Sequence, residues 1–70
     1  MASARAKELA KNGFATLAEA QEFLQVKQTF LYKLMRTRVI PYGRFGRHRK
    51  IPWNALHEFA ANQLDRINNL

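Results

Sequence analysis

The chain has 70 residues and no cysteine, so we expect one small domain without disulfide bonds or thiolate metal ligands. Twelve Lys and Arg residues against five Asp and Glu give a net charge of +7, which favours nucleic acid as a partner over a membrane surface or an acidic protein. The chain contains no run of about 18 apolar residues and no secretory signal, so we expect no membrane-spanning segment.

The first residues, MASARAKELAKNG, are rich in alanine and lysine. Ser3 is a good N-cap and Asn12-Gly13 a good stop signal, which together predict a short helix. Its apolar face is small, and an isolated helix of this length is marginal in water. We therefore expect residues 1–13 to be a frayed helix or disordered arm, or else an arm that orders on DNA or on a neighbouring protomer. Residues 14–70 are expected to form the folded domain.

A capping box opens the next helix, with Thr16 as N-cap and Glu19 reaching back to it. The helix is predicted over 17–24, with an apolar stripe of Leu17, Ala20, Phe23 and Leu24. After a brief turn, a second helix is predicted over 28–36, with its inner face made by Phe30, Leu31, Leu34 and Met35. Two short helices joined by a tight turn are typical of a helix-turn-helix, whose second helix enters the major groove of DNA.

A basic β-hairpin is predicted between the two prolines of the chain. Its strands are expected over 42–45 and 48–51, and Gly46-Arg47 forms the tight turn because glycine adopts positive φ freely. Phe45 and Ile51 are expected to point inward. The basic side chains expected to point mainly to solvent are Arg44, Arg47, Arg49 and Lys50. Such a hairpin beside a helix-turn-helix is a wing.

The last helix is predicted to open at Pro52-Trp53 and to run to about Ile67. Leu56 and Phe59 are its expected core residues, and Trp53 is expected to be partly buried. The apolar stripe continues further than so small a domain requires, through Leu64, Ile67 and Leu70. Two interpretations of this extension stay open, namely capping of the core and contact with another protein.

The segment from Lys27 to Lys50 holds eight of the twelve basic residues and no acidic residue. Apolar residues are interleaved with these charges, so the segment can fold and hold its cations on one surface, which a polyanion binds well. The predicted fold class is therefore mainly α with a small two-stranded antiparallel β-hairpin, a winged helix-turn-helix.

The order of these features resembles the excisionase-type, MerR-like winged helix-turn-helix family over about residues 14–60. The most specific part is Ile40-Pro41, the hairpin with Gly46-Arg47 at its tip, and Ile51-Pro52 followed by Ala55-Leu56. The resemblance implies a sequence-specific double-stranded DNA-binding protein. Its implied role is that of an excisionase, or recombination directionality factor, which binds and bends sites near a phage or mobile-element attachment site and promotes integrase-mediated excision. The chain's length and its own Met1 look most like a free-standing excisionase, and the alternative is a small transcriptional regulator that binds a promoter operator.

The implied partners are double-stranded DNA, the cognate integrase and further copies of the chain that associate cooperatively on DNA. The implied location is the bacterial cytoplasm, on the nucleoid. No membrane, cofactor, metal or small-molecule substrate is expected, and no enzyme activity, because neither histidine has a ligand partner at a workable spacing. A module that binds RNA or an acidic protein stays open as a third interpretation, although the hairpin has few outward aromatics for stacking on single-stranded RNA.

Candidate DNA-binding residues lie on the second helix and the wing. Gln28, Thr29 and Lys33 are expected to reach base edges or nearby phosphates, since Gln can read adenine and Lys can read guanine. For Tyr32, packing against the hairpin and a phosphate hydrogen bond stay open. Arg47 is expected in a narrow minor groove. The remaining expected phosphate contacts are Lys27, Arg36, Arg44, His48, Arg49 and Lys50.

The sequence departs from the family pattern at three positions. Gln25, in the turn between the helices, and Arg38, after the second helix, stand where the family usually has glycine. A left-handed backbone at either position would cost about 1 kcal/mol. Lys27 replaces the usual serine N-cap of the second helix, so the cap is expected to move to Thr29 or to be weak.

Overall fold

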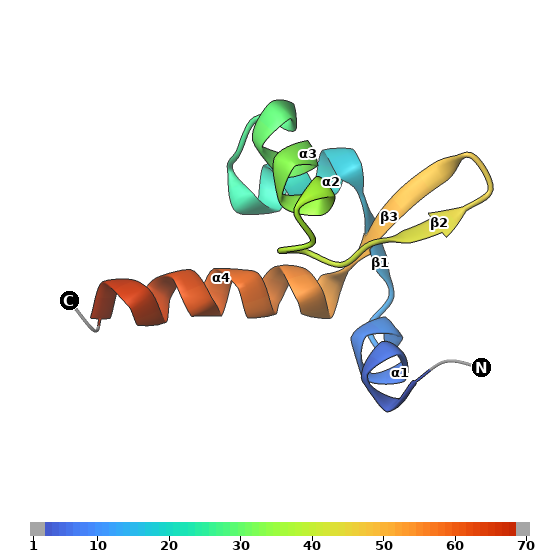
Figure 1. Ribbon diagram of the computed structural model, residues 1–70, viewed down its shortest axis with the longest axis horizontal. Helices are drawn as coiled ribbons and strands as arrows, with labels where there is room; N and C mark the ends of the chain where they lie inside the picture. Colours follow the sequence, from blue (N-terminus) through green and yellow to red (C-terminus); the bar gives the residue numbers. More distant parts are fainter. Residues whose placement is uncertain (1–2, 69–70) are drawn as a thin grey trace.

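The computed structural model describes the backbone of residues 3–68 and the side chains of residues 3–65. Within this part, helices pack around the base of one small antiparallel sheet, and the β2–β3 hairpin projects from the body (Figure 1). The elements in chain order are α1 (Ala4–Ala10), β1 (Phe14–Thr16), α2 (Leu17–Leu24), α3 (Gln28–Arg36), β2 (Gly43–Phe45), β3 (His48–Pro52) and α4 (Trp53–Asn68). The winged helix-turn-helix fold predicted from the sequence is confirmed, and the predicted bounds of α2 and α3 agree with those observed.

The predicted two-stranded hairpin is confirmed as β2 and β3, and a third strand that was not predicted, β1, extends it to a sheet of order β1-β3-β2. The added strand β1 pairs with β3, placing Ala15 opposite Ile51, and both side chains are fully buried. A strand of three residues is too short to show an alternating apolar pattern, which explains why the sequence did not reveal it. β3 is therefore the central strand, and the outer half of the β2–β3 hairpin extends beyond β1.

The register of the hairpin corrects the prediction for Phe45. Phe45 pairs with His48, so it lies on the opposite face of the sheet from Ile51, which is in the core. Phe45 is 39% exposed and packs edge-on against Phe14 of β1, with their ring centroids 4.8 Å apart. The third strand thus supplies an aromatic partner on the outer face, where the sequence alone indicated none.

The core lies where α2, α3 and α4 meet the base of the sheet. Its largest fully buried side chains are Leu31, Met35, Ile40, Ile51 and Leu56. Trp53 is partly buried against this core, as predicted, whereas Phe59, predicted as a core residue, is also only partly buried. Because α3 buries its inner side here, its polar and basic residues are held on a fixed outer surface.

Local backbone geometry fixes the helix-turn-helix. The capping box of α2 is confirmed, since the Thr16 hydroxyl accepts from the Glu19 N–H and the Glu19 carboxylate accepts from the Thr16 N–H. Gln25 ends α2 in the left-handed conformation, with φ of 59°, as the family comparison led us to expect. Lys27 is the N-cap of α3 and makes no side-chain capping bond, so the start of α3 is held by packing rather than by a cap.

Two phenylalanines are more exposed than the sequence predicted. Phe30 was expected on the inner face of α3 but is 45% exposed, because Leu31, Leu34 and Met35 already define the buried side and Phe30 falls on its flank. Phe23 of α2 is 38% exposed and lies edge-on to Trp53 and His57 of α4.

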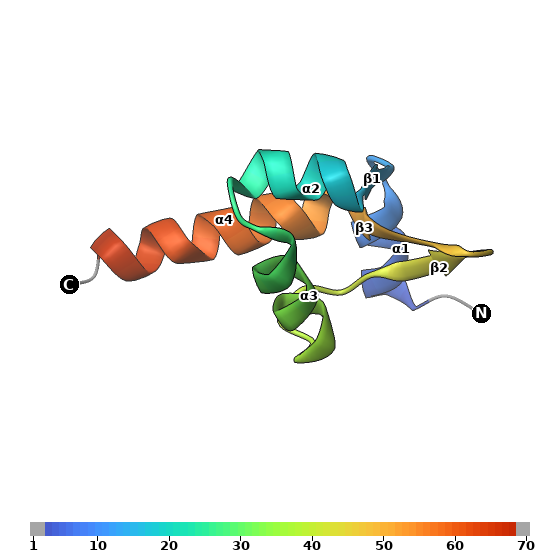
Figure 2. The same ribbon diagram turned by 90° about the horizontal axis from the view of Figure 1, so that it is seen from above.

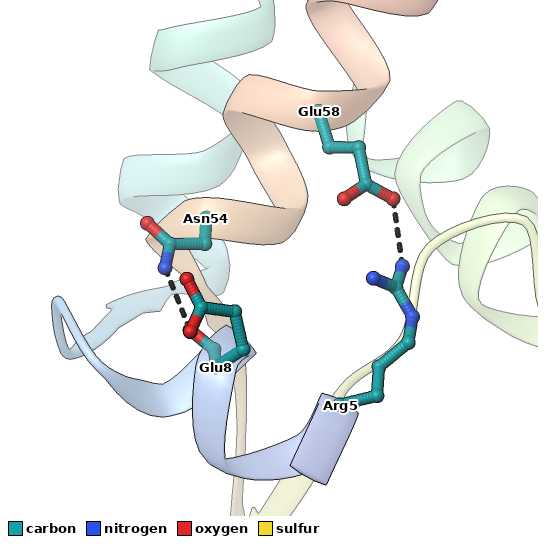
Figure 3. Close-up of polar contacts among 4 residues, drawn as sticks. All are labelled: Arg5, Glu8, Asn54 and Glu58. Atoms are coloured by element: carbon teal, nitrogen blue, oxygen red, sulfur yellow. Dashed lines mark hydrogen bonds and ion pairs between the residues drawn. The ribbon is translucent and has the colours of Figure 1, made fainter.

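The N-terminal segment forms a helix that packs against the start of α4 (Figure 3). The Ser3 hydroxyl caps α1 by accepting from the Ala6 N–H, as predicted. The Asn54 side-chain amide donates to the Glu8 carbonyl at 2.8 Å, and Arg5 donates to the Glu58 carboxylate at 2.7 Å. The hydrogen bond from Arg5 to Glu58 raises the pKa of Arg5 above its ordinary value, and the negative charge of Glu58 adds to this effect.

Helix α4 extends away from the body of the molecule on the side opposite the wing (Figures 1 and 2). Leu64, in its projecting part, is 61% exposed, so it does not cap the core of the chain. The side chain of Ile67, and Leu70 as a whole, lie outside the described residues. None of the helices in the described part of the chain has the length and hydropathy needed to cross a membrane.

Candidate nucleic-acid interface

The outer surface of α3 follows from the side that it buries. Leu31, Leu34 and Met35 face the core, so Thr29 and Lys33 lie on the outermost side by helical periodicity. One flank of α3 carries residues spaced four apart, which therefore stack along the helix axis. These are Gln28, Tyr32 and Arg36, and Tyr32 is the half-buried member of the set. This flank faces the wing, as the contacts of Tyr32 show.

The wing divides its cations between two faces. Arg44 pairs with Arg49 across the hairpin, and both lie on the face that carries Ile51 toward the core. His48 and Lys50 lie on the other face, where the Lys50 ammonium is 5.8 Å from the centroid of Phe45. Arg47 is in the tight turn, next to Gly46 with φ of 66°. The cations predicted on the wing are all present, but they do not form a single face.

Arg49 joins the wing to α3. Its guanidinium carbon lies 5.0 Å from the ring centroid of Tyr32 and 5.9 Å from that of Tyr42, at the base of the wing. Both distances are in the range of a cation–π interaction. The Tyr32 hydroxyl in turn accepts a hydrogen bond from the Gln28 side-chain amide at 3.0 Å. Of the two roles left open for Tyr32, packing against the hairpin is the one observed.

Two basic hollows lie on either side of this contact, both bordered by Tyr32 and Arg49. One separates α3 from the base of the wing and is lined by Tyr32, Met35, Arg36, Arg38, Tyr42 and Arg49. The other lies between the start of α2 and the outer wing and is lined by Thr16, Leu17, Tyr32, Arg47, His48, Arg49 and Lys50. The surface between α3 and the wing is therefore concave and rich in guanidinium groups.

Not every predicted residue joins this concave surface. Lys27 borders a separate hollow at the turn between α2 and α3, together with Gln25. Thr29 and Lys33 project from α3 without lining either basic hollow. Sequence reasoning missed Arg38 and Tyr42, which line the hollow at the base of the wing. Two signals in the sequence could have found them: Arg38 is a cation at a position where the family usually has glycine, and Tyr42 is an aromatic residue next to Pro41.

The acidic residues are kept away from this surface. They lie on α1, α2 and α4 at Glu8, Glu19, Glu22, Glu58 and Asp65. Within the residues that the structure describes, Arg5–Glu58 is the single ion pair, so no carboxylate neutralises the cations of α3 and the wing. Nor does any group of three potential metal-binding side chains occur in this part of the chain. The chemistry available between α3 and the wing is thus that of cations and hydrogen-bond donors.

Comparison of the sequence with known protein families finds one that matches. The model of the helix-turn-helix domain family matches residues 16–64, which include α2, α3, the wing and most of α4. No curated protein and no solved structure matches the chain. The matched segment covers more than half of the 70 residues, and its elements are those of a DNA-binding winged helix-turn-helix. The chain belongs to the excisionase-type helix-turn-helix family.

Proposed function

We propose that this protein is an excisionase, which binds selected duplex DNA sites beside an attachment site, bends them and promotes excision by an integrase. Cooperative association of several copies on DNA and contact with the cognate integrase are part of the proposal. It acts by binding, without cofactor or catalytic group, and its place is the cytoplasm of a bacterial host, on the nucleoid.

The observation that best supports DNA binding is the joint between α3 and the wing. Arg49 of β3 lies against Tyr32 of α3, so the two basic elements border the same two hollows. A helix in the major groove and a hairpin tip in the next minor groove both have to meet the same duplex. A contact between the two elements reduces the flexibility that is lost on binding.

The proposed roles of the side chains follow from their positions. Gln28, Thr29 and Lys33 of α3 meet base edges in the major groove, where amide and ammonium groups distinguish base pairs. Arg47, at the tip, enters the minor groove, whose negative potential attracts arginine. The remaining cations contact the DNA backbone: they bind phosphate oxygens and set the register on the duplex, and they are Lys27, Arg36, Arg44, His48, Arg49 and Lys50.

The salt dependence of binding tests the DNA interface. If the protein neutralises about five phosphates, the logarithm of the association constant should fall with the logarithm of salt concentration at a slope of about −4.5. Competition between duplex DNA and structured RNA in the same titration separates this proposal from an RNA-binding module. A flat salt response, or preference for RNA, would contradict it.

An excision assay tests the finer part of the proposal. Purified cognate integrase, an attachment-site substrate and this protein should together yield the excised circle, and omission of the protein should abolish it. The alternative, a small transcriptional regulator with the same DNA interface, binds an operator and leaves excision unchanged. Binding that is selective but without effect on excision would favour the regulator.

A further inference from the structure

We propose that Tyr32 is a positioning residue that orients Gln28 for recognition of adenine, and that Arg49 of the wing holds Tyr32 in place for this task. This inference rests on the proposed DNA binding by α3 and extends it. It assigns the base preference at one position to a contact between the helix and the wing, rather than to the helix alone.

The first step is the hydrogen bond between the two side chains of α3. Gln28 and Tyr32 are one helical turn apart, and the Gln28 Nε2 donates to the Tyr32 hydroxyl at 3.0 Å. An exposed glutamine otherwise samples many rotamers and loses this freedom on binding DNA. The hydrogen bond restricts the Gln28 side chain before DNA arrives, with its Nε2 toward the Tyr32 hydroxyl group.

The second step is the chemistry that remains available on Gln28. One N–H of its amide is used by Tyr32, and the other N–H and Oε1 stay free. Adenine presents the N7 acceptor and the N6 amino donor side by side in the major groove. One free N–H and one carbonyl oxygen match that pair of groups, so an amide held by Tyr32 still offers both bonds that adenine needs.

The third step is the support of the Tyr32 ring from the wing. Arg49 lies 5.0 Å from the Tyr32 centroid and also 5.9 Å from that of Tyr42. The half-buried ring therefore has a cation from β3 against it, and its hydroxyl group is directed along α3 toward Gln28. A movement of the wing would shift Tyr32 and, through it, the amide of Gln28.

Selection of binding sites from a pool of random duplexes tests the inference. The wild-type protein and a Gln28→Ala variant are compared first, and the position at which the variant loses its adenine preference is the one read by Gln28. Tyr32→Phe keeps the ring and its contact with Arg49 but removes the hydroxyl group. We expect it to lower the adenine preference at that position by about two- to tenfold, the effect of one neutral hydrogen bond.

The matched control is Tyr42→Phe, because Tyr42 also contacts Arg49 but lies at the base of the wing, away from Gln28. It should leave the preference at that position unchanged. In a Gln28→Ala background, Tyr32→Phe should have no further effect on that preference. Thermal unfolding of both phenylalanine variants shows whether they fold as the wild type does.

Each outcome decides a different question. If Tyr32→Phe weakens binding to every sequence equally, or leaves the adenine preference intact, the positioning role is overturned and the proposed function stands. If Gln28→Ala alters no position while the wild type still selects a sequence, the inference is again overturned without affecting DNA binding. If the wild type selects no sequence at all, both the inference and sequence-selective binding are overturned.

Discussion

At the scale of single residues, two side chains occupy backbone conformations that favour glycine. Gln25 has φ of 59° and Arg38 has φ of 62°, in the left-handed region. A residue with a Cβ atom loses about 1 to 2 kcal/mol there relative to the right-handed conformation. Arg38 places a cation in the hollow at the base of the wing. Gln25 compensates in part, because its side-chain amide donates to the Glu22 carbonyl.

We expect Gln25→Gly to raise the free energy of unfolding by about 0.5 to 1 kcal/mol, because relief of the left-handed strain outweighs the larger entropy of glycine in the unfolded chain. In a domain of this size the thermal midpoint should rise by about 4 to 8 °C per kcal/mol. Gln25→Ala is the control, since alanine keeps the strain and removes the side-chain hydrogen bond. Equal midpoints for the two variants would show that φ at this position has little energetic weight.

Arg47 provides the sharpest test of the wing at the residue scale. Arg47→Ala should weaken binding to the preferred duplex by about 1 to 3 kcal/mol and relax base preference at one minor-groove position. The control is Lys7→Ala, which removes one cation from α1, on the other side of the molecule from α3 in Figure 1. Titrations at one salt concentration compare the two variants, and similar losses would mean that only net charge matters.

At the scale of elements, α1 shows how a short helix is held in a small protein. None of its residues is fully buried, Leu9 packs partly buried against the core, and a hydrogen bond and an ion pair join α1 to α4. Asn54 donates to the Glu8 carbonyl and accepts from the Asn12 side chain, so it ties two points of the N-terminal segment to the start of α4. The Trp53 N–H also donates to the Gly13 carbonyl at 3.1 Å. Together these bonds hold a helix that would be marginal alone.

Asn54→Ala should therefore destabilise the packing of α1 against α4 more than Glu58→Gln, which removes the Arg5–Glu58 ion pair. Removal of its two hydrogen bonds is expected to cost about 1 to 2 kcal/mol. Glu58→Gln, which removes the charge of the exposed Arg5–Glu58 pair, should cost less, because solvent screens an exposed ion pair. Amide hydrogen exchange in residues 4–10 measures the difference. Faster exchange in the Glu58 variant than in the Asn54 variant would reverse this ranking.

At the scale of the whole molecule, one set of charges has two opposite effects. In the free protein the excess cations, which give a net charge of +7, repel one another. The closest such pair across the hairpin is Arg44 opposite Arg49. The same cations are the groups that attract a nucleic acid. Salt should therefore stabilise the free fold while it weakens the complex.

We expect the thermal midpoint of the free protein to rise by about 2 to 5 °C between low and moderate sodium chloride, as screening reduces repulsion. The affinity for duplex DNA should fall over the same range. Arg44→Gln removes one partner of the cross-strand pair, so its midpoint should respond less to salt. A midpoint that falls with salt would indicate that attractive pairs dominate the free protein.

Much of this arrangement could be predicted from the sequence because local signals agreed with one another. The capping box, the glycine of the hairpin turn and the apolar spacing of α3 each act within a few residues. β1 could not be predicted, since three residues form a strand only through pairing with β3, 34 to 38 positions later. The outward placement of Phe45 depends on that strand as well, through Phe14. The contact of Tyr32 with Arg49 depends on how α3 sits against the sheet, which no local pattern encodes.

Side chains alternate between the two faces of the wing, and this alternation restricts where residues can be inserted into its strands. The turn at Gly46 has open space around its Cα, so extra residues meet no obstacle there. Two residues added to each strand would lengthen the reach of Arg47 and leave Arg44 and Arg49 on their present side. A single residue inserted in β3 between Arg49 and Ile51 would turn the outer half of that strand over and remove the guanidinium from Tyr32. Insertions between Arg49 and the core should therefore come in even numbers, whereas the tip beyond the Arg44–Arg49 pair is free of this restriction.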